Sequence, residues 1–198
     1  MDRQGFLLSE SQLRAVGQSH YENFRAAAPV GTAELRDWKR RVAKFQTTVG
    51  LAPAAEQTTL FDLAAADSQA EGLNPFELPP QNTEFWRWRF SDVGVAAMYF
   101  VIDYAAPLLL YVGETVKSNQ RWKGEHDCKR YLVNYRQAHY QNQMTSQLGI
   151  AFWPHAPSQR RARQTLESRL IYKWRSPFNK ENWDFWKTPF VSGKGELR

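Results

Sequence analysis

The most constraining feature of this sequence is a pair of β-rich segments that are joined by a very short connection. Residues 95–103 and 108–112 are rich in the residue types that favour strands. Only Tyr104-Ala105-Ala106-Pro107 lies between them, and a Pro-containing connection of this length suits a turn. The pattern therefore predicts a β-hairpin, around which the rest of the domain has to be built.

Three further elements are predicted after the hairpin. Residues 119–143 are polar, basic and mostly helical, and residues 148–153 form an apolar run that predicts a third strand. Ser158 and Pro177 are placed to begin and end a helix over residues 158–175. Its inward face is predicted to hold Leu166, Leu170, Ile171 and Trp174. This order predicts an α+β fold with a small, mostly antiparallel three-stranded sheet that is flanked by helices.

The distribution of charge is more informative than its net value of +6. Residues 117–175 hold twelve Lys and Arg against three Asp and Glu, whereas residues 51–83 hold five acids and no base. The net charge alone is typical of general solubility, but a positive field of this kind is suited to a polyanion. The segment therefore favours a nucleic-acid partner. The candidate phosphate-binding residues are Lys117, Lys129, Arg130, Arg160, Arg161 and Arg163.

The composition divides the chain into three parts. Residues 1–50 predict two helices, and residues 51–83 have the acidic, Ala/Pro-rich composition of a linker. Residues 84–198 form the main domain. The N-terminal pair is either a hairpin packed on that domain, with a solvated basic side, or an accessory element that grips DNA. Its second helix is predicted to begin at Thr32 and to have an apolar face of Leu35, Trp38, Val42, Phe45 and Val49.

Cysteine usage and hydropathy predict a cytoplasmic protein. Cys128 is the single cysteine, which excludes an intramolecular disulfide and a Cys-rich zinc site. The first residues lead into no signal-peptide core, and the longest apolar runs are far too short to span a bilayer. A reducing compartment and no membrane partner are the expectation.

Two tyrosine segments, an arginine and a late Glu/Asn pair are arranged at specific spacings. Tyr99 ends Ala97-Met98-Tyr99, and Tyr111 begins Tyr111-Val112-Gly113 twelve residues later. Arg121 follows Tyr111 by ten residues, and Glu167 precedes Asn179 by twelve. Each residue has a structural alternative, such as cross-strand packing, a solvated helix charge, a surface ion pair or a turn cap. The combination is far more specific than any single member.

In this combination the chain resembles the GIY-YIG nuclease superfamily over residues 94–183. The resemblance implies that both tyrosine motifs lie on the first two strands of a small antiparallel sheet. It places Arg121 on the following helix, Glu167 on a later helix, and Asn179 after the proline that ends that helix. The matching late segments are Leu166-Glu167-Ser168-Arg169-Leu170-Ile171 and Pro177-Phe178-Asn179.

The resemblance also implies a chemistry. Glu167 would be the protein ligand of one Mg²⁺ or Mn²⁺, a hard cation that takes oxygen ligands. Tyr111 or Tyr99 would accept the proton of the attacking water. Arg121 would bridge two phosphate oxygens and hold the charge that develops on them. Asn179 would orient a water or the substrate.

Two departures from the family pattern fall near these residues. Ala97-Met98-Tyr99 stands where Gly-Ile-Tyr is expected, and it keeps the tyrosine. Many members carry His or Tyr four residues after the arginine, where this chain has Glu125, with His126 one residue later. Either His126 takes that role or the role is absent. Lys123 is a reserve cation in the same segment.

A second motif lies inside the acidic linker. Gln57-Thr58-Thr59-Leu60-Phe61 resembles the peptides that bind the bacterial sliding clamp, the β subunit of DNA polymerase III. In such a peptide Leu60 and Phe61 would fill a hydrophobic pocket, and the amide of Gln57 would hydrogen-bond in a second one. The alternative is that Leu60 and Phe61 attach the linker to the protein's own core.

These observations predict a metal-dependent DNA endonuclease that hydrolyses phosphodiester bonds and is recruited by the sliding clamp. Its expected setting is repair, recombination or mismatch processing. Two alternatives remain: a restriction or mobile-element endonuclease, and a catalytically silent DNA- or RNA-binding protein on the same fold.

Overall fold

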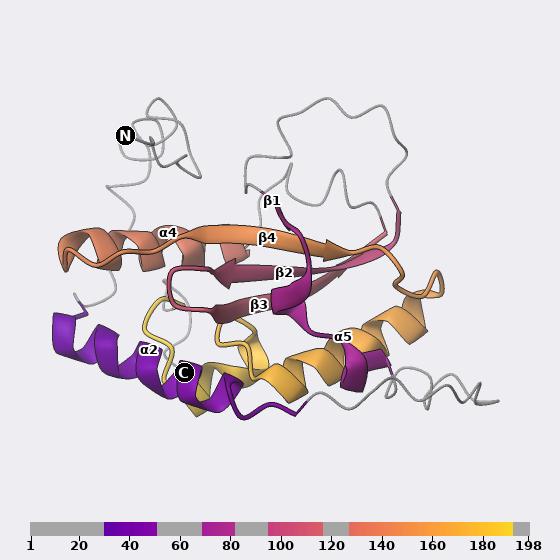
Figure 1. Cartoon of the computed structure of the whole chain (residues 1–198), viewed down its shortest axis with the longest axis horizontal. Helices are drawn as coiled ribbons and strands as arrows, with labels where there is room; N and C mark the ends of the chain where they lie inside the picture. The colour runs from indigo at the N-terminus through magenta and orange to yellow at the C-terminus, as the bar shows by residue number, and fades with distance from the viewer. Residues whose placement is uncertain (1–29, 51–68, 82–94, 117–126, 192–198) are drawn as a thin grey trace, which may run out of the picture.

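The computed structural model of the chain describes residues 30–50, 69–81, 95–116 and 127–191. Its centre is a four-stranded antiparallel sheet in the order β1-β4-β2-β3, with helices packed on both faces (Figure 1). The α+β class is therefore confirmed. The strands are β1 (Pro80–Gln81), β2 (Ala97–Asp103), β3 (Leu108–Thr115) and β4 (Leu148–Trp153).

The predicted hairpin is present as β2 and β3, which pair from Ala97 with Thr115 to Asp103 with Leu108. The predicted number of three strands is wrong, because β1 pairs with β4 as a fourth strand. β1 has only two residues, one of them Pro80, so it carries no alternation that a sequence pattern could reveal.

Part of the predicted linker is built into this fold. Residues 69–81 include the 3-10 helix η1 (Pro75–Glu77) and β1. Ala70 and Leu73 are buried in the core on one side of the sheet, and Lys173 donates hydrogen bonds to the carbonyls of Ala70 and Glu71. The linker prediction is therefore wrong for these residues, and residues 51–68 lie outside the described part of the chain.

The main helices are α2 (Thr32–Gln46), α4 (Asp127–Gln141) and α5 (Arg160–Trp174). The predicted caps differ from the observed ones: Gly31 and Gln159 are the N-caps of α2 and α5, in place of Thr32 and Ser158. Thr32 instead donates a hydrogen bond from Oγ1 to Asn142 Oδ1 at 2.6 Å, which joins the start of α2 to the end of α4. The chain continues after α5 into η3 (Lys180–Asn182) and α6 (Trp183–Trp186).

Two hydrophobic cores lie on the two sides of the sheet. Tyr99 and Val101 face the first core, together with residues of α2, α4 and the C-terminal segment. Phe100 and Ile102 face the second core, where α5 packs. Because successive residues of a strand point to opposite faces, β2 supplies both cores and is buried along its whole length.

The helix α2 belongs to the first core and is not an appendage to the main domain. Leu35, Trp38 and Val42 are buried there, and the Trp38 ring meets the Tyr135 and Phe190 rings edge-on at 6.2 and 5.2 Å. The predicted apolar face of α2 is thus confirmed in its first three turns. The interpretation of a basic outer side holds only in part, because Lys39 is buried.

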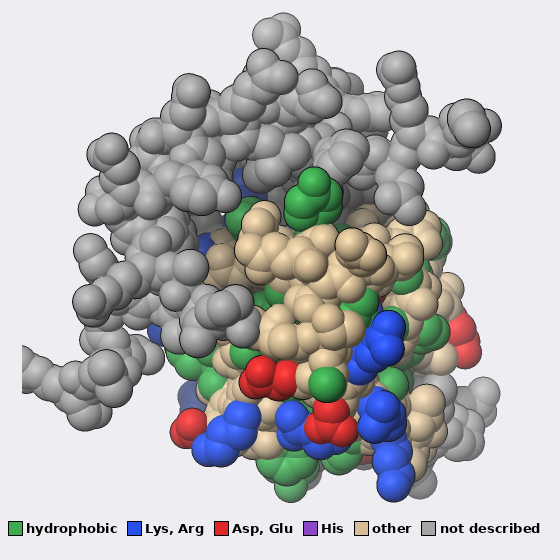
Figure 2. All heavy atoms as spheres, turned by 90° about the vertical axis from the view of Figure 1, so that its left-hand side faces the viewer, with side chains coloured by type: hydrophobic (Ala, Val, Ile, Leu, Met, Phe, Trp, Pro, Cys, Tyr) green, Lys and Arg blue, Asp and Glu red, His purple; other side chains and the backbone are tan. Residues whose placement is uncertain are grey.

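The outer side of α2 carries charges of both signs. Arg40 and Arg41 both pair with Asp37, at 3.4 and 3.1 Å. Figure 2, in which the left-hand side of Figure 1 faces the viewer, shows Lys and Arg side chains interspersed with Asp and Glu over the lower part of the molecule. Such pairs lower the local positive field, so the packed helix with a solvated surface is the better interpretation of α2 than a DNA-gripping element.

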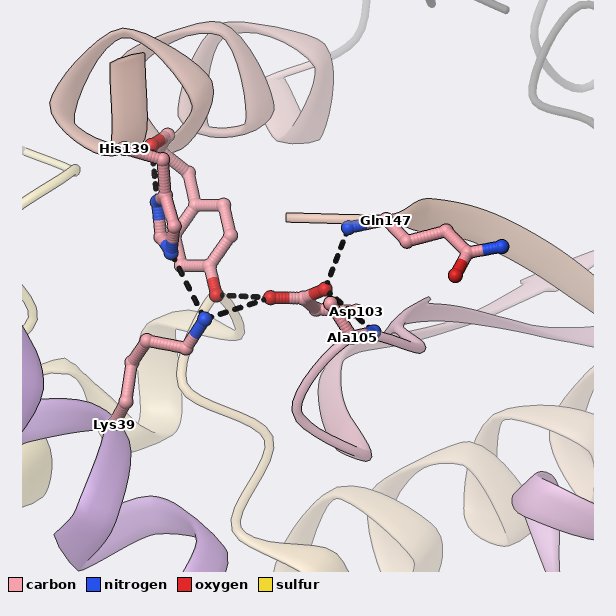
Figure 3. Close-up of polar contacts among 6 residues, drawn as sticks. Lys39, Asp103, Ala105, His139 and Gln147 are labelled. Atoms are coloured by element: carbon pink, nitrogen blue, oxygen red, sulfur yellow. Dashed lines mark hydrogen bonds and ion pairs between the residues drawn. The ribbon is translucent and has the colours of Figure 1, made fainter. Parts of the chain in front are cut away.

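A buried polar cluster joins α2 to the sheet and to α4. Figure 3 shows Lys39 reaching from α2 to Asp103 and His139, with Nζ at 3.0 Å from Asp103 Oδ2 and 2.9 Å from His139 Nε2. The Tyr135 hydroxyl donates to the same Asp103 oxygen at 2.7 Å. The other oxygen, Oδ1, accepts from the backbone N–H groups of Gln147 and Ala105 at 2.8 and 3.1 Å.

The hydrogen bonds of this cluster fix its protonation states. His139 Nδ1 lies 2.7 Å from the Tyr135 carbonyl, which can only accept, so Nδ1 carries the hydrogen and Nε2 accepts from Lys39. Burial lowers the pKa of His139 and, with the nearby Lys39 charge, outweighs the Tyr135 hydrogen bond and the Asp103 charge, which raise it. Burial raises the pKa of Asp103, but Lys39 and the hydrogen bonds outweigh it and leave a net lowering. Burial and the Asp103 charge raise the pKa of Tyr135 well above its ordinary value.

We expect the free energy of unfolding to decrease as the pH falls below about 6.5, the ordinary pKa of histidine in an unfolded chain. The lowered pKa means that the folded state resists protonating His139, so its contribution is complete above that pH and is lost as the pH falls towards the folded value. Urea unfolding of wild type and His139→Gln between about pH 8 and about pH 5 measures this difference.

The matched control is His155→Gln, since His155 is exposed. Its unfolding curve should follow wild type across the same pH range. An identical pH dependence in wild type and His139→Gln would contradict the neutral, buried state of His139.

Candidate active site

The two motif tyrosines meet on one face of the hairpin because β3 contains a bulge. Ile102 pairs with Leu109 but Val101 pairs with Tyr111, so Leu110 is an extra residue in β3. A bulge of this kind changes the face to which the following side chains point. It brings Tyr111 to the side of the sheet that holds Tyr99, where their rings stack at 5.9 Å with 28° between the planes.

Gly113 makes room for the Tyr99 ring. The two residues pair across the strands, and a Cβ at Gly113 would overlap Cζ and the hydroxyl of Tyr99, with Cε1 at 2.6 Å. The glycine of the Tyr-Val-Gly motif therefore permits a close approach of ring and backbone. Tyr99 is fully buried beneath it, whereas Tyr111 is half-buried.

Two side-chain amides pair with the outer edge of β3. Gln46 Nε2 donates to the Leu109 carbonyl and Gln46 Oε1 accepts from the Leu109 N–H, both at 2.9 Å. Asn179 repeats this on Val112, with Nδ2 to the carbonyl at 2.9 Å and the N–H to Oδ1 at 3.0 Å. Between them, the Phe178 N–H donates to the Leu110 carbonyl at 2.9 Å. The edge strand is thus closed by side chains and loop backbone.

Asn179 has a positioning role in this arrangement. It is buried, and Ser176 Oγ donates to its Oδ1 at 2.6 Å in addition to the bond from Val112. Both ends of the amide are therefore engaged by the protein itself. The predicted role in orienting water or substrate is replaced by one in which Asn179 holds the strand that carries Tyr111 and Gly113.

Glu167 lies on the inward side of α5, which packs against β3. The buried residues of this helix are Arg163, Leu166, Leu170, Ile171 and Trp174. At about 100° per residue, Glu167 falls between Trp174 and Ile171 on the helical circumference. The residue as a whole is half-buried, which agrees with a position on the packed side of α5.

Arg163 is buried one turn before Glu167, with a side-chain exposure of 1%. Its Nε donates to Glu114 Oε2 at 2.5 Å, and its Nη1 donates to the Pro157 and Ser158 carbonyls. The prediction that Arg163 binds phosphate is wrong, because its guanidinium is buried in the protein and forms an ion pair with Glu114. Glu114 was not predicted as a site residue. The sequence indicates it only as a charged residue directly after Gly113 in a mostly apolar strand.

The other predicted basic residues lie at two places. Lys129 and Arg130 are half-buried at the start of α4, where burial lowers the pKa of Lys129 and Arg130 lies 3.5 Å from Asp127. Arg160 and Arg161 are exposed at the start of α5. The remaining predicted site residues lie outside the described residues: Lys117, Arg121, Lys123 and His126, and the peptide residues Gln57, Leu60 and Phe61.

The described residues offer a limited set of metal ligands. Within residues 30–50, 69–81, 95–116 and 127–191, no group of three or more His, Cys, Asp or Glu is placed to hold a metal ion. Glu114 pairs with Arg163, and Glu167, which lies on the helix that packs against β3, carries an oxygen donor of the kind that Mg²⁺ takes. A single carboxylate completed by waters and phosphate fits this donor set.

Comparisons with protein-family models, with curated proteins and with solved structures give no match. Among the described helices, none is long and apolar enough to cross a membrane.

The close contact between Tyr99 and Gly113 predicts that a single methyl group added at residue 113 lowers the stability of the fold. Gly113→Ala should lower the free energy of unfolding by about 1–3 kcal/mol, because the added Cβ has to displace the buried Tyr99 ring. Gly50→Ala is the control, since a Cβ there meets nothing within 4 Å. Urea unfolding compares the two, and equal stabilities would show that the ring moves away freely.

Proposed function

We propose that the chain is a metal-dependent DNA endonuclease of the GIY-YIG type. The observation that carries the proposal is the stack of Tyr99 on Tyr111, on a strand whose edge is held by Asn179 and against which the helix of Glu167 packs. Four of the five motif residues, namely Tyr99, Tyr111, Glu167 and Asn179, thus lie on β3 or on an element that contacts it. They come from segments that are up to 80 residues apart in the chain.

The two tyrosines differ in what they can do. Tyr99 is fully buried and supports the site, whereas Tyr111 is half-buried and is the better candidate to accept a proton from an attacking water. A phenol titrates near pH 10, so a positive charge beside it is needed to lower its pKa. In this proposal Arg121 and Lys123 supply that charge and bind the phosphate, with His126 as a further candidate base.

Glu167 would hold the Mg²⁺ or Mn²⁺ ion. When bound, such an ion neutralises charge on the phosphodiester and lowers the pKa of a coordinated water. The half-buried position of Glu167, on a helix that packs against the strand of Tyr111, supports this assignment. The pair of buried Arg163 and half-buried Glu114 fixes the neighbouring turn of α5 on β3.

Recruitment by the sliding clamp is the second part of the proposal. It rests on Gln57, Leu60 and Phe61 and on the acidic stretch around them. Residues 69–81, which follow this stretch, pack against α5 and β4, so the peptide would be attached close to the sheet. Repair, recombination and mismatch processing are the settings in which a clamp and a nuclease meet.

We expect Glu167→Gln to abolish detectable cleavage of supercoiled plasmid in Mg²⁺ or Mn²⁺. The amide keeps the shape of the side chain but removes the charge that holds the ion, a loss of about a thousandfold or more in rate. Binding of DNA in the absence of divalent ions should persist, as measured by fluorescence anisotropy.

Glu181→Gln, which changes an exposed carboxylate of η3, is the control and should cleave like wild type. Full activity of Glu167→Gln would remove it as the metal ligand. Wild-type DNA binding without cleavage under any divalent ion would favour the catalytically silent alternative.

The clamp is tested with the double change Leu60→Ala and Phe61→Ala. We expect wild type to bind a bacterial sliding clamp with a Kd on the order of micromolar, and the double variant to lose this binding, because these two side chains supply most of the buried apolar area. Calorimetric titration measures the affinity, and plasmid cleavage by the double variant should be unchanged. Unfolding of the double variant would instead assign Leu60 and Phe61 to the protein's own core.

A further inference from the structure

Two exposed aromatic rings flank one arginine at the end of α5. The Arg175 guanidinium lies 4.3 Å from the centre of the Tyr172 ring and 5.2 Å from that of Phe185. Tyr172 is 67% exposed and Phe185 is 53% exposed, so both rings present a face to solvent. We call these three residues the aromatic–arginine stack.

The backbone at Arg175 is unusual for its position. Arg175 is the C-cap of α5 and has a left-handed conformation with φ of 48°, where glycine is the ordinary residue. A non-glycine residue in this conformation is strained, so interactions elsewhere in the structure have to offset the strain. Arg175 makes side-chain contacts with both rings, and its Nη1 lies 3.4 Å from Asn182 Oδ1.

The end of α5 that carries the stack lies beside β3, the strand of Tyr111. Gln46 Nε2 donates to the carbonyls of both Trp174 and Leu109, and the Phe178 N–H donates to the Leu110 carbonyl, directly before Tyr111. The residue before Arg175 is therefore joined through Gln46 to the part of β3 that leads into Tyr111.

The charges on α5 favour a polyanion. α5 has no Asp or Glu besides Glu167, while Arg160, Arg161 and Arg169 are exposed on it. The segment after α5 adds exposed charges of both signs, namely Lys180 and Lys187 with Glu181 and Asp184. Aromatic rings with interleaved arginine in a basic surface are the means by which proteins hold unpaired bases.

We propose that the aromatic–arginine stack binds an unpaired base of the DNA substrate. The enzyme would thereby prefer gapped or branched DNA to a fully paired duplex, whose bases are already stacked on each other. This inference rests on the proposed function and adds to it the structural class of the DNA.

The test measures binding without divalent ions, by fluorescence anisotropy of two labelled probes: a paired duplex, and the same duplex with a gap of about five nucleotides. Wild type should bind the gapped probe more tightly. Tyr172→Ser and Phe185→Ser should each weaken binding to the gapped probe about tenfold and leave binding to the paired probe unchanged, since only an unpaired base can stack on a ring. Tyr172→Phe keeps the ring and should bind like wild type.

The matched control is Tyr140→Ser, because Tyr140 is 83% exposed on α4 but lies outside the stack. Equal binding of both probes by wild type, or an equal loss on both probes in the serine variants, would overturn the proposal. So would a change of oligomeric state in the variants, measured by sedimentation, because it would assign the surface to a second copy of the chain.

Plasmid cleavage, measured in parallel, separates this inference from the proposed function. A ring-dependent preference for the gapped probe without any metal-dependent cleavage would remove the nuclease and keep the stack as a binding site. Metal-dependent cleavage with unchanged binding in the serine variants would remove the stack alone.

Discussion

The outer edge of β3 is hydrogen-bonded by side chains, and the candidate site depends on this. An open strand edge exposes N–H and C=O groups that need partners, and in a larger sheet a further strand beside β3 would supply them. Here Gln46 and Asn179 supply them through their amides, with the Phe178 backbone between them. Because the amides take little space, the edge is closed while Tyr111, between Leu110 and Val112, stays partly accessible.

The buried charge of Asp103 is the second constraint on the molecule. A carboxylate without solvent is unfavourable unless every oxygen is satisfied, and Asp103 receives partners from α2, α4 and the start of β4. These partners orient three elements relative to the hairpin. A hydrophobic side chain at this position would pack, but it would not fix the orientation of its neighbours. The Asp103 carboxylate accepts four hydrogen bonds, and three of them fix the positions of Lys39, Tyr135 and Gln147.

Local patterns in the sequence predicted the elements well. The hairpin, β4 and the inward face of α5 follow from residue type and spacing, and the bounds of α5 differ from the prediction by two residues at its start and one at its end. The fourth strand was missed because Pro80 and Gln81 are too few to form a pattern.

The side-chain environment was harder to predict, because it depends on residues far apart in the chain. Lys39 and Arg163 look like solvated helix charges, and each is buried by an acidic partner that lies 64 or 49 residues away. Asn179 was found by its spacing from Glu167, but its bond to Val112 follows only from the fold. The bulge that turns Tyr111 towards Tyr99 likewise has no signature in Leu108-Leu109-Leu110.

The closure of β3 also sets the order in which the site can form during synthesis. Gln46 bonds both Leu109 and Trp174, and Trp174 is 128 residues further along the chain than Gln46, while Asn179 follows Val112 by 67 residues. A nascent chain that ends before residue 179 lacks the two hydrogen bonds between Asn179 and Val112, even if β2 and β3 have already paired. The arrangement around Tyr111 is therefore completed only after residue 179 has been synthesised, which ties any activity of the protein to the segment that follows α5.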